Sequence, residues 1–162
     1  MTYSLEEVLP NKRAVRRSFD RAQGFDRACF VHDETRGRLL ERLDWLKLAP
    51  AVVVDLGCAT GRAAEALAAR YPAATVLAVD SSLSMLRAAS ERAGPSVAVF
   101  GGDAERLPLP SQRADLIFAN LVLASCRPAA RSPRPTTAFM FTPPSICTTS
   151  VTCWCKPALP TR

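Results

Sequence analysis

Residues 54–61, with the sequence Val-Asp-Leu-Gly-Cys-Ala-Thr-Gly, have the composition of a ligand-binding turn between a strand and a helix. Glycine at positions 57 and 61 allows a positive φ and a close approach between backbone and ligand. The helix that follows presents free N–H groups at its N-terminus to a carboxylate or a phosphate, and Asp55 offers a carboxylate to a cation. The turn therefore favours a ligand that carries both an ammonium and a carboxylate group.

Two other kinds of glycine loop do not match this turn. Dinucleotide-binding folds use G-x-G-x-x-G, which residues 57–61 do not contain. Phosphate-binding loops continue from glycine into Lys-Ser or Lys-Thr, whereas Gly61 is followed by Arg62 and Ala63. The remaining alternative is a strand-to-helix turn that binds nothing.

Asp80 ends the next apolar run, 19 positions after Gly61. An acid at this place can accept hydrogen bonds from both hydroxyls of a ribose. The alternative is a structural role beside a helix N-cap, which Ser81 or Ser82 can form. Both roles are compatible with one side chain.

Asp103 follows Gly101 and Gly102, where a flat ligand can lie against the backbone. Its carboxylate can accept a hydrogen bond from an exocyclic amine such as that of adenine, or it can stabilise a turn. Asp115 opens a further apolar run, and we predict a structural role for it.

Short apolar runs alternate with helical patterns between residues 49 and 125. Strands are predicted at 51–56, 75–80, 97–100 and 114–119, and helices at 62–70 and from Ser81 or Ser82 to about residue 93. This alternation indicates an α/β fold with a doubly wound parallel sheet.

Residues 1–48 form a predicted helical lead-in. One helix begins near residue 11 and ends before Gly24, and a second runs from near Asp33 to Leu48. The second has an apolar face made of Leu39, Leu40, Leu43 and Leu46. The arginine-rich face of the first helix is either solvated or binds an acidic substrate.

Residues 126–162 have a different composition. Positions 127–162 contain seven prolines, seven threonines and no acidic residue, so we expect an irregular Pro/Thr/Cys-rich tail with one candidate strand at 138–142. Cys147, Cys153 and Cys155 lack the paired C-x-x-C spacing of a zinc site, and we predict no metal site. The abrupt change resembles translation in a shifted reading frame.

The net charge of +6 is concentrated in this tail, which holds five basic residues and leaves 16 basic and 15 acidic residues in positions 1–126. The charge therefore does not indicate a nucleic-acid-binding face. No apolar run reaches the roughly 18 residues of a membrane span, and residues 1–10 do not have the pattern of a secretory signal. We expect a cytoplasmic protein, and the sequence does not indicate its oligomeric state.

Four segments together resemble class I S-adenosylmethionine-dependent methyltransferases, namely residues 55–61, Asp80, residues 102–108 and residues 115–120. Residues 13–22, followed by Phe25 and Asp26, are similar to the lead-in of malonyl-acyl-carrier-protein O-methyltransferases of biotin synthesis. The resemblance covers about residues 11–125. It implies a Rossmann-like methyltransferase fold, incomplete because the helix and strands that follow the fourth strand in that family are not recognisable here. One side of the fourth strand is then expected to be unpaired.

The resemblance divides the chain into a lead-in (1–48), an S-adenosylmethionine-binding half-domain (49–125) and the tail (126–162). It implies S-adenosyl-L-methionine as cofactor and assigns nine residues to it. Those nine, ordered from the methionine end through ribose and adenine to the methyl group, are Asp55, Gly57, Ala59 and Gly61, then Asp80 and Ser81, then Asp103 and Ala104, and finally Asn120. The family usually has glycine where Ala59 stands, so the alanine methyl group is expected to narrow the approach to the ligand.

The implied methyl acceptor is a small molecule or an acyl group on a carrier protein, here a malonyl carboxylate. A carboxylate needs no general base, so positioning supplies most of the acceleration and no catalytic residue is assigned. His32, the only histidine, is not assigned this role. We expect this activity to be impaired by the incomplete C-terminus. The alternatives are a non-catalytic S-adenosylmethionine-binding or assembly protein, an unstable remnant, and hydroxylation of a protein side chain.

Overall fold

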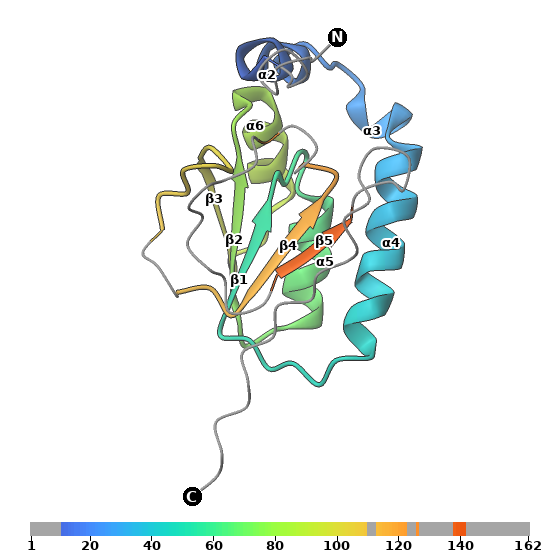
Figure 1. Ribbon diagram of the computed structural model, residues 1–162, viewed down its shortest axis with the longest axis vertical. Coiled ribbons are helices and arrows are strands. Elements are labelled where there is room, and N and C mark those ends of the chain that lie inside the picture. The colour runs from blue at the N-terminus through green and yellow to red at the C-terminus, as the bar shows by residue number, and fades with distance from the viewer. Residues whose placement is uncertain (1–10, 110–112, 123–125, 127–137, 142–162) are drawn as a thin grey trace, which may run out of the picture.

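A computed structural model describes residues 11–109, 113–122, 126 and 138–141, the last four as backbone only. Its centre is a sheet of five parallel strands in the order β3-β2-β1-β4-β5 (Figure 1). The strands are β1 (Val52–Leu56), β2 (Thr75–Asp80), β3 (Val97–Gly101), β4 (Leu116–Asn120) and β5 (Ala138–Phe141). The strand order reverses at β1, which confirms the predicted Rossmann-like α/β fold and places a topological switch point at the end of β1.

The two helices that connect β1 to β3 form where the sequence predicts them. Helix α5 (Arg62–Arg70) follows β1, and helix α6 (Leu83–Arg92) follows β2. Ser82 is the N-cap of α6, and its hydroxyl accepts a hydrogen bond from the Met85 backbone N–H at 3.3 Å. Each helix returns the chain to the start of the next parallel strand, so the carboxyl ends of all five strands meet at one edge.

The described part of the lead-in, from residue 11 onward, contains three helices instead of the two predicted. They are α2 (Lys12–Asp20), α3 (Phe25–Ala28) and α4 (Phe30–Asp44). Gly24, with φ of 74°, separates α2 from α3 as expected. The prediction that the last helix runs from near Asp33 to Leu48 was wrong at both ends. The Cys29 carbonyl already accepts the Asp33 N–H at 2.9 Å. At the other end, the Trp45 and Leu46 N–H groups both donate at 3.2 Å to carbonyls three residues back, which closes the helix at Asp44.

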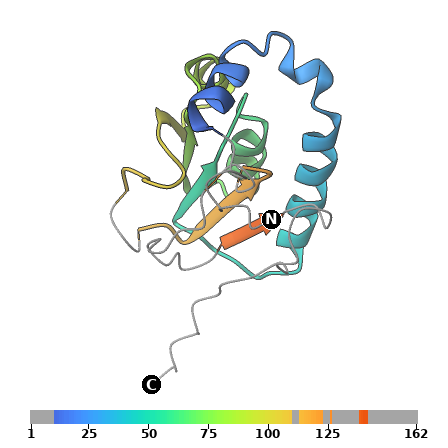
Figure 2. The ribbon, with the colours of Figure 1, turned by 45° about the horizontal axis from the view of Figure 1, so that its top comes forward.

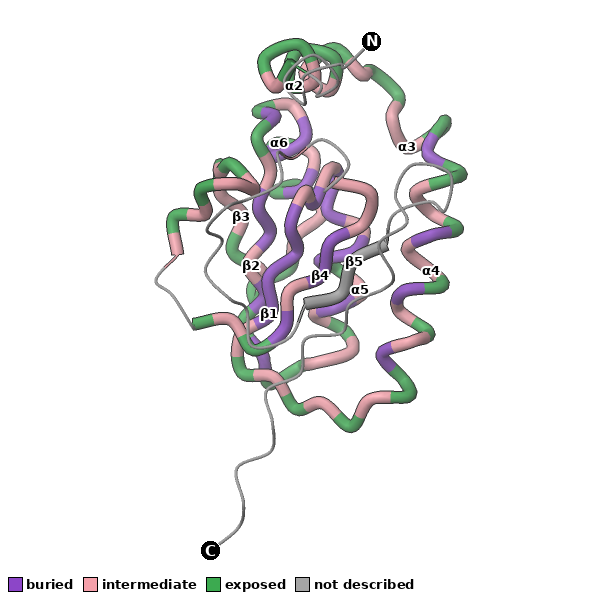
Figure 3. The backbone as a smooth tube through the Cα atoms, viewed as in Figure 1, coloured by how far each residue is buried: buried purple, intermediate pink, exposed green. Residues whose placement is uncertain are grey.

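Helices α4, α5 and α6 share one hydrophobic core with a single face of the sheet. Leu39 and Leu43 of α4 are fully buried against it, and Leu40 and Leu46 pack at its margin, as their predicted common face requires. Phe118 of β4 is fully buried in the same cluster. Figure 3 shows the buried residues running along β1, β2 and β4, so the strands that carry the candidate site are held by the centre of the core.

The expectation that one side of β4 is unpaired was wrong. Strand β5 pairs with β4 in parallel, with Ile117 opposite Ala138 and Asn120 opposite Phe141. This strand falls within the candidate strand predicted at 138–142. The apolar segment supplies the backbone groups that β4 needs, although a proline-rich stretch precedes it in the sequence. The remainder of the predicted tail, including Cys147, Cys153 and Cys155, lies outside the described residues.

Two features lie at opposite ends of the strands. At the amino edge, the Asp115 carboxylate accepts the Ala51 and Val52 backbone N–H groups at 3.0 and 2.9 Å, which gives this residue the structural role predicted for it. At the carboxyl edge, α2 lies beyond the strand ends and next to α6 (Figures 1 and 2). Helix α2 has no buried residue, so it forms a roof over this edge and contributes little to the core.

Candidate functional site

A cleft of about 510 Å³ lies at the carboxyl edge of the sheet, beneath α2. Its volume is within the range of pockets that bind small molecules and cofactors. The ends of β1, β2, β3 and β4 form the floor of the cleft, and α2 with the start of α4 forms its roof. The polar and small residues that line the cleft are Lys12, Arg13, Arg16, His32, Gly57, Ala59, Asp80, Ser81, Gly101, Gly102, Asp103, Ala104, Asn120 and Cys126.

Seven of the nine residues assigned from the sequence line this cleft: Gly57, Ala59, Asp80, Ser81, Asp103, Ala104 and Asn120. Asp55 instead lines a separate cavity of about 40 Å³, whose walls also include Gly57, Ala59 and Asn120. The two cavities therefore adjoin at the glycine turn. Gly61 lines neither of them.

Gly57 is fixed by its surroundings as well as by its backbone. Its φ is 70°, and a β-carbon added there would lie 2.6 Å from Cγ2 of Val122. Its N–H donates to the Val79 carbonyl at 2.8 Å, which binds the turn to the end of β2. Only glycine is compatible with both the left-handed conformation and the close contact with Val122. The glycine turn therefore packs directly against the residues that follow β4.

Gly61 has a packing role. A β-carbon at this position would approach the Ala89 Cα to 3.0 Å, so the glycine lets α5 and α6 pack closely. The sequence pattern could not separate this role from ligand contact, because the family motif contains both kinds of glycine. The assignment of Gly61 to the cofactor therefore lacks support from its position.

Ala59 stands at the middle of the turn in the left-handed region, with φ of 46°. Its N–H donates to Oδ2 of Asp80 at 3.0 Å, while the Ser82 N–H donates to Oδ1 of Asp80 at 2.8 Å. Asp80 thus joins the glycine turn to the start of α6. Burial raises the pKa of Asp80, the backbone hydrogen bonds oppose that shift, and the nearby Asp20 carboxylate adds to it.

Asp55 is a buried carboxylate whose charge is poorly compensated. It is 1 % exposed, and within the described part of the chain its Oδ2 has no hydrogen-bond partner. Burial raises its pKa from 3.8 to about 7, the Ala64 N–H opposes this rise, and Asp80 adds to it. A cation bound at the adjoining wall of the cleft would relieve this penalty.

Asp103 has a partner that sequence reasoning missed. The Lys12 ammonium, from the first turn of α2, lies 2.8 Å from both Asp103 oxygens and 2.7 Å from Glu105 Oε2. Burial lowers the pKa of Lys12, but its hydrogen bonds to the two acids outweigh burial and leave the pKa raised. The residue predicted to accept from an amine therefore already accepts from one supplied by the chain.

Asn120 joins the end of β4 to α4. Its Oδ1 accepts from the Thr35 hydroxyl at 2.8 Å, and its Nδ2 donates to the His32 carbonyl at 2.8 Å. The amide is therefore held in one orientation at the cleft wall. The His32 ring packs edge-on against Phe25, with centroids 5.3 Å apart, and burial lowers the pKa of His32.

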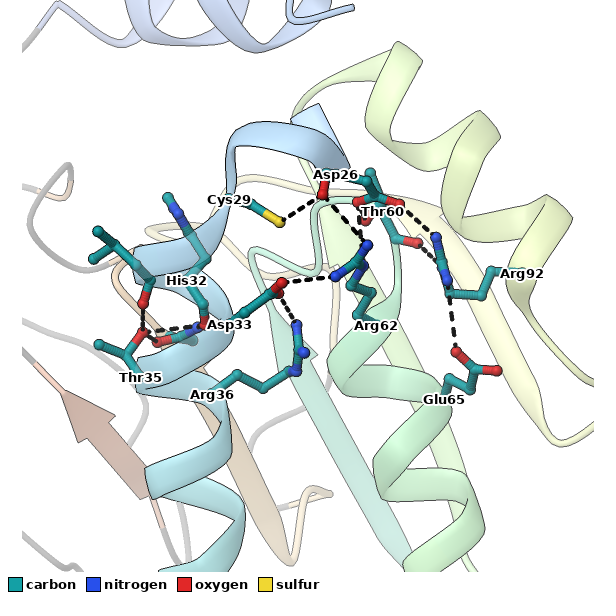
Figure 4. A network of polar contacts seen from close by, with 12 residues as sticks. Asp26, Cys29, His32, Asp33, Thr35, Arg36, Thr60, Arg62, Glu65 and Arg92 are labelled. Carbon is teal, nitrogen blue, oxygen red and sulfur yellow. Dashed lines mark hydrogen bonds and ion pairs between the residues drawn. The ribbon is translucent and has the colours of Figure 1, made fainter. Parts of the chain in front are cut away.

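A network of charges attaches α3 and α4 to the glycine turn (Figure 4). Asp26 accepts from the Thr60 hydroxyl at 2.6 Å and from Arg92 of α6 at 2.6 Å, while Arg62 binds Asp33 at 2.7 Å. The Arg62 and Arg92 side chains are about one-third exposed, so each pair is individually weak. Together they link two helices of the lead-in to α5 and α6 around the turn.

Sequence reasoning identified the floor of the site and missed the roof. Lys12, Val15 and Phe19 of α2 line the cleft together with Phe25 of α3, and Phe19 and Phe25 are in ring contact at 5.9 Å. The signal was present as helical spacing of Lys12, Val15 and Phe19 on one face. The spacing alone does not indicate what this face of α2 covers.

The carboxylates of this region suit a cationic ligand. The Asp80 carboxylate lies close enough to Asp55 and to Asp20 for the charges of each pair to repel. The pKa values of Asp55 and Asp80 are both raised. S-adenosylmethionine carries a sulfonium and an ammonium, and its adenosine offers hydroxyls and an amine to acidic acceptors. The orphaned Asp55 oxygen and the acidic lining of the cleft therefore fit this cofactor.

The chain matches the family model described as "Methyltransferase domain" over residues 53–133, half of its length. The match begins in β1 and includes the glycine turn, Asp80 and Asp103. The chain belongs to the methyltransferase domain family. S-adenosyl-L-methionine is the cofactor of such methyltransferases.

Two curated relatives are malonyl-[acyl-carrier protein] O-methyltransferases. The one from Methylovorus sp. is 42% identical over 130 residues, which are 75% of this chain and 44% of the relative. The one from Gallionella capsiferriformans is 35% identical over 131 residues, 75% of this chain and 45% of the relative. The chain thus spans less than half the length of these relatives.

Solved structures agree on the fold. A SAM-dependent methyltransferase of Thermotoga maritima superimposes with a TM-score of 0.51 at 26% identity, covering 67% of this chain and 48% of that one. The methyltransferase solved in complex with the Haloferax volcanii Trm112 activator gives a TM-score of 0.54 at 25% identity, covering 62% and 46%. Both confirm the methyltransferase fold predicted from the sequence.

Among the described residues, no three His, Cys, Asp or Glu side chains come together as a metal-binding group. The described helices include none with the length and apolarity needed to cross a bilayer.

Proposed function

We propose that this methyltransferase domain binds S-adenosyl-L-methionine in the cleft beneath α2 and is the cofactor-binding part of a malonyl-[acyl-carrier protein] O-methyltransferase. The observation that carries the proposal is that Asp80 and Asp103 line one cleft at the switch point of the sheet, while Asp55 lines the small cavity that adjoins this cleft at the glycine turn. The names of the relatives support the acceptor. The cytoplasmic location predicted from the sequence belongs to the same proposal.

Each wall of the cleft has a task under this proposal. Asp55 and the glycine turn hold the methionine ammonium and carboxylate, Asp80 with Ser81 holds the ribose, and the turn at Asp103 and Ala104 holds the adenine. Asn120, which is fixed by Thr35 and the His32 carbonyl, lies at the methyl end. Bound cofactor supplies an electrophilic methyl group on sulfur.

The acceptor requires little from the chain. A malonyl carboxylate is ionised at neutral pH and attacks through its own oxygen, so no side chain has to remove a proton. Residues of the cleft contribute by orienting the two reactants and by excluding water between them. Among the described cleft residues, His32 is the only imidazole; burial lowers its pKa, and it is assigned no proton transfer.

A thermal-shift titration with S-adenosylhomocysteine tests the binding half of this proposal. The parent chain is expected to melt cooperatively at a temperature that rises with ligand. Asp80→Asn keeps the shape of the side chain but removes its charge, and the shift is expected to shrink strongly. Glu41→Gln, an exposed change of the same chemistry on α4, is the matched control and is expected to shift like the parent. Equal shifts in all three proteins would refute the site.

The transfer half needs a separate assay. The chain is incubated with S-adenosylmethionine and a malonylated carrier protein, and intact mass spectrometry detects addition of one methyl group to the acyl chain. A carrier with an acetyl group, which lacks the free carboxylate, is the control. Methyl addition to both carriers, or to the protein of either carrier, would refute the carboxylate as acceptor.

A further inference from the structure

Helix α2 is attached to the rest of the domain at both of its ends. At its C-terminal end, the Ser82 hydroxyl donates to Asp20 Oδ1 at 2.7 Å and the Ser84 hydroxyl donates to the Phe19 carbonyl at 3.2 Å. At its N-terminal end, Lys12 binds Asp103 and Glu105 across the cleft. The residues between these ends lie over the cleft.

The two attachments differ in exposure. Ser82 is fully buried and is also the N-cap of α6, so the C-terminal attachment is part of the folded core. The Lys12 and Asp103 side chains are 38% and 46% exposed, so water and salt can replace the contact between them. The N-terminal end is therefore the end that can detach while the other acts as the hinge.

Lys12 donates to the Asp103 carboxylate, which is the group that the proposed function assigns to the adenine amine. Its Nζ lies 2.8 Å from both Asp103 oxygens, so it sits along the direction that bisects the carboxylate. The Glu105 N–H donates to Asp103 Oδ1 at 2.9 Å and uses a further acceptor direction. An adenine amine that approaches these oxygens must displace Lys12 from at least one of them.

We propose that Lys12 is an exchangeable latch of the cofactor cleft, which holds α2 closed over the cleft and passes from Asp103 to Glu105 alone when a purine amine binds Asp103. The displacement of Lys12 by a purine rests on the proposed function, whereas the attachment of α2 through Lys12 does not. Glu105 Oε2 is already 2.7 Å from Lys12, so the ammonium keeps one acid after the exchange. Lys12 is a positioning residue in this scheme.

Cys126 reports on the latch without any ligand. It is half-buried in the cleft, and its thiol senses the charges of Glu105, Lys12 and Asp103. Cys29 and Cys58 are buried, so replacing Cys147, Cys153 and Cys155 by serine leaves Cys126 as the accessible thiol. The measurement is the rate constant for alkylation of the Cys126 thiolate by iodoacetamide in this background, taken from the pH dependence of the rate so that a change in the pKa of Cys126 does not enter, and followed by mass spectrometry at low and high salt.

Lys12→Met is expected to raise the alkylation rate of Cys126 roughly three- to tenfold, since two weak ion pairs are lost. The parent rate is expected to rise with salt and the variant rate to stay constant. Lys47→Met, an exposed lysine in the loop before β1, is the matched control and is expected to behave like the parent. A Lys12→Met rate equal to the parent rate, or equal salt dependence in both, would overturn the latch.

Titration with S-adenosylhomocysteine tests the exchange, and two variants are expected to move the affinity in opposite directions. Lys12→Met removes the competitor for Asp103 and should tighten binding about two- to fivefold. Glu105→Gln removes the acid that receives the displaced ammonium and should weaken binding by a similar factor. Weaker binding in Lys12→Met, or the same direction in both variants, would overturn the exchange. Failure of the proposed function looks different, because no variant would then bind the ligand while the alkylation rates would still differ.

Discussion

Replacement of Asp55 by asparagine is expected to stabilise the empty protein and weaken its ligand binding. Burial raises the pKa of Asp55 from 3.8 to about 7. Between these values the folded state binds more protons than the unfolded state, so the free energy of unfolding falls as the pH rises from about 4 to 7. A shift of about three pKa units corresponds to roughly 4 kcal/mol, which is the upper limit of this loss.

Asparagine keeps the shape of Asp55 and carries no charge at any pH. Its amide nitrogen still lacks an acceptor at the position of Oδ2, which costs about 1–3 kcal/mol. The net gain in the free energy of unfolding at pH 8 is therefore expected to be about 1–3 kcal/mol, and no gain is expected at pH 4. Urea denaturation of parent and variant at both pH values measures this difference.

The same carboxylate links ligand affinity to pH. A bound ammonium favours the charged form of Asp55 and releases its proton, so affinity for S-adenosylhomocysteine should rise from pH 6 to pH 8 in the parent. In Asp55→Asn the affinity should be lower and should vary less over that range. The reasoning is refuted if the variant keeps the parent's pH dependence of stability, because Asp55 would then not be the group that titrates.

Three further substitutions test the geometry of the turn. Ala59→Gly removes a left-handed alanine at φ 46°, so the free energy of unfolding should rise by about 0.5 kcal/mol, and calorimetry should show tighter binding of S-adenosylhomocysteine; weaker binding would contradict a ligand at this methyl group. Gly57→Ala places a β-carbon 2.6 Å from Val122 and should destabilise the domain by about 2 kcal/mol or more in urea denaturation, with partial rescue by Val122→Ala; absence of rescue would mean that the φ of 70° alone sets the cost. Thr35→Val leaves Asn120 Oδ1 without its 2.8 Å donor and should cost about 1–2 kcal/mol, against little change for the exposed Thr75→Val at the start of β2.

The strands and the floor of the site were predictable because each depends on local sequence. The runs that became β1, β2 and β4 are apolar on both faces, as buried parallel strands require, and Asp55, Asp80 and Asn120 mark their carboxyl ends. Parallel pairing then brings those ends together without further information. Such positions follow from short apolar runs and from the turn residues that end them.

The roof could not be predicted because it depends on contacts between distant residues. Lys12 and Asp103 are 91 positions apart, and Asn120 and Thr35 are 85 apart. The arginine-rich pattern of α2 fits a solvated helix equally well, because the side of a helix that covers a cleft need not be buried. The frameshift and the predicted absence of a metal site at Cys147, Cys153 and Cys155 concern residues outside the described part. The frameshift stays a hypothesis that sequencing of the gene would test.

Cofactor binding and methyl transfer, which are both proposed for this chain, can fail separately. Every acid assigned to the cofactor lies between β1 and the turn after β3, within the family match, and is held by α5, α6 and the lead-in. In the relatives, more than half of the length has no counterpart in this chain. A ligand-dependent rise in melting temperature without methyl transfer would identify a domain that keeps the cofactor site and lacks an acceptor site, as the non-catalytic alternative predicts. Transfer to a malonylated carrier would instead require that the cleft and its surroundings in this chain present the acceptor carboxylate to the methyl group, and Asn120 at the end of β4 would then be the first residue to vary.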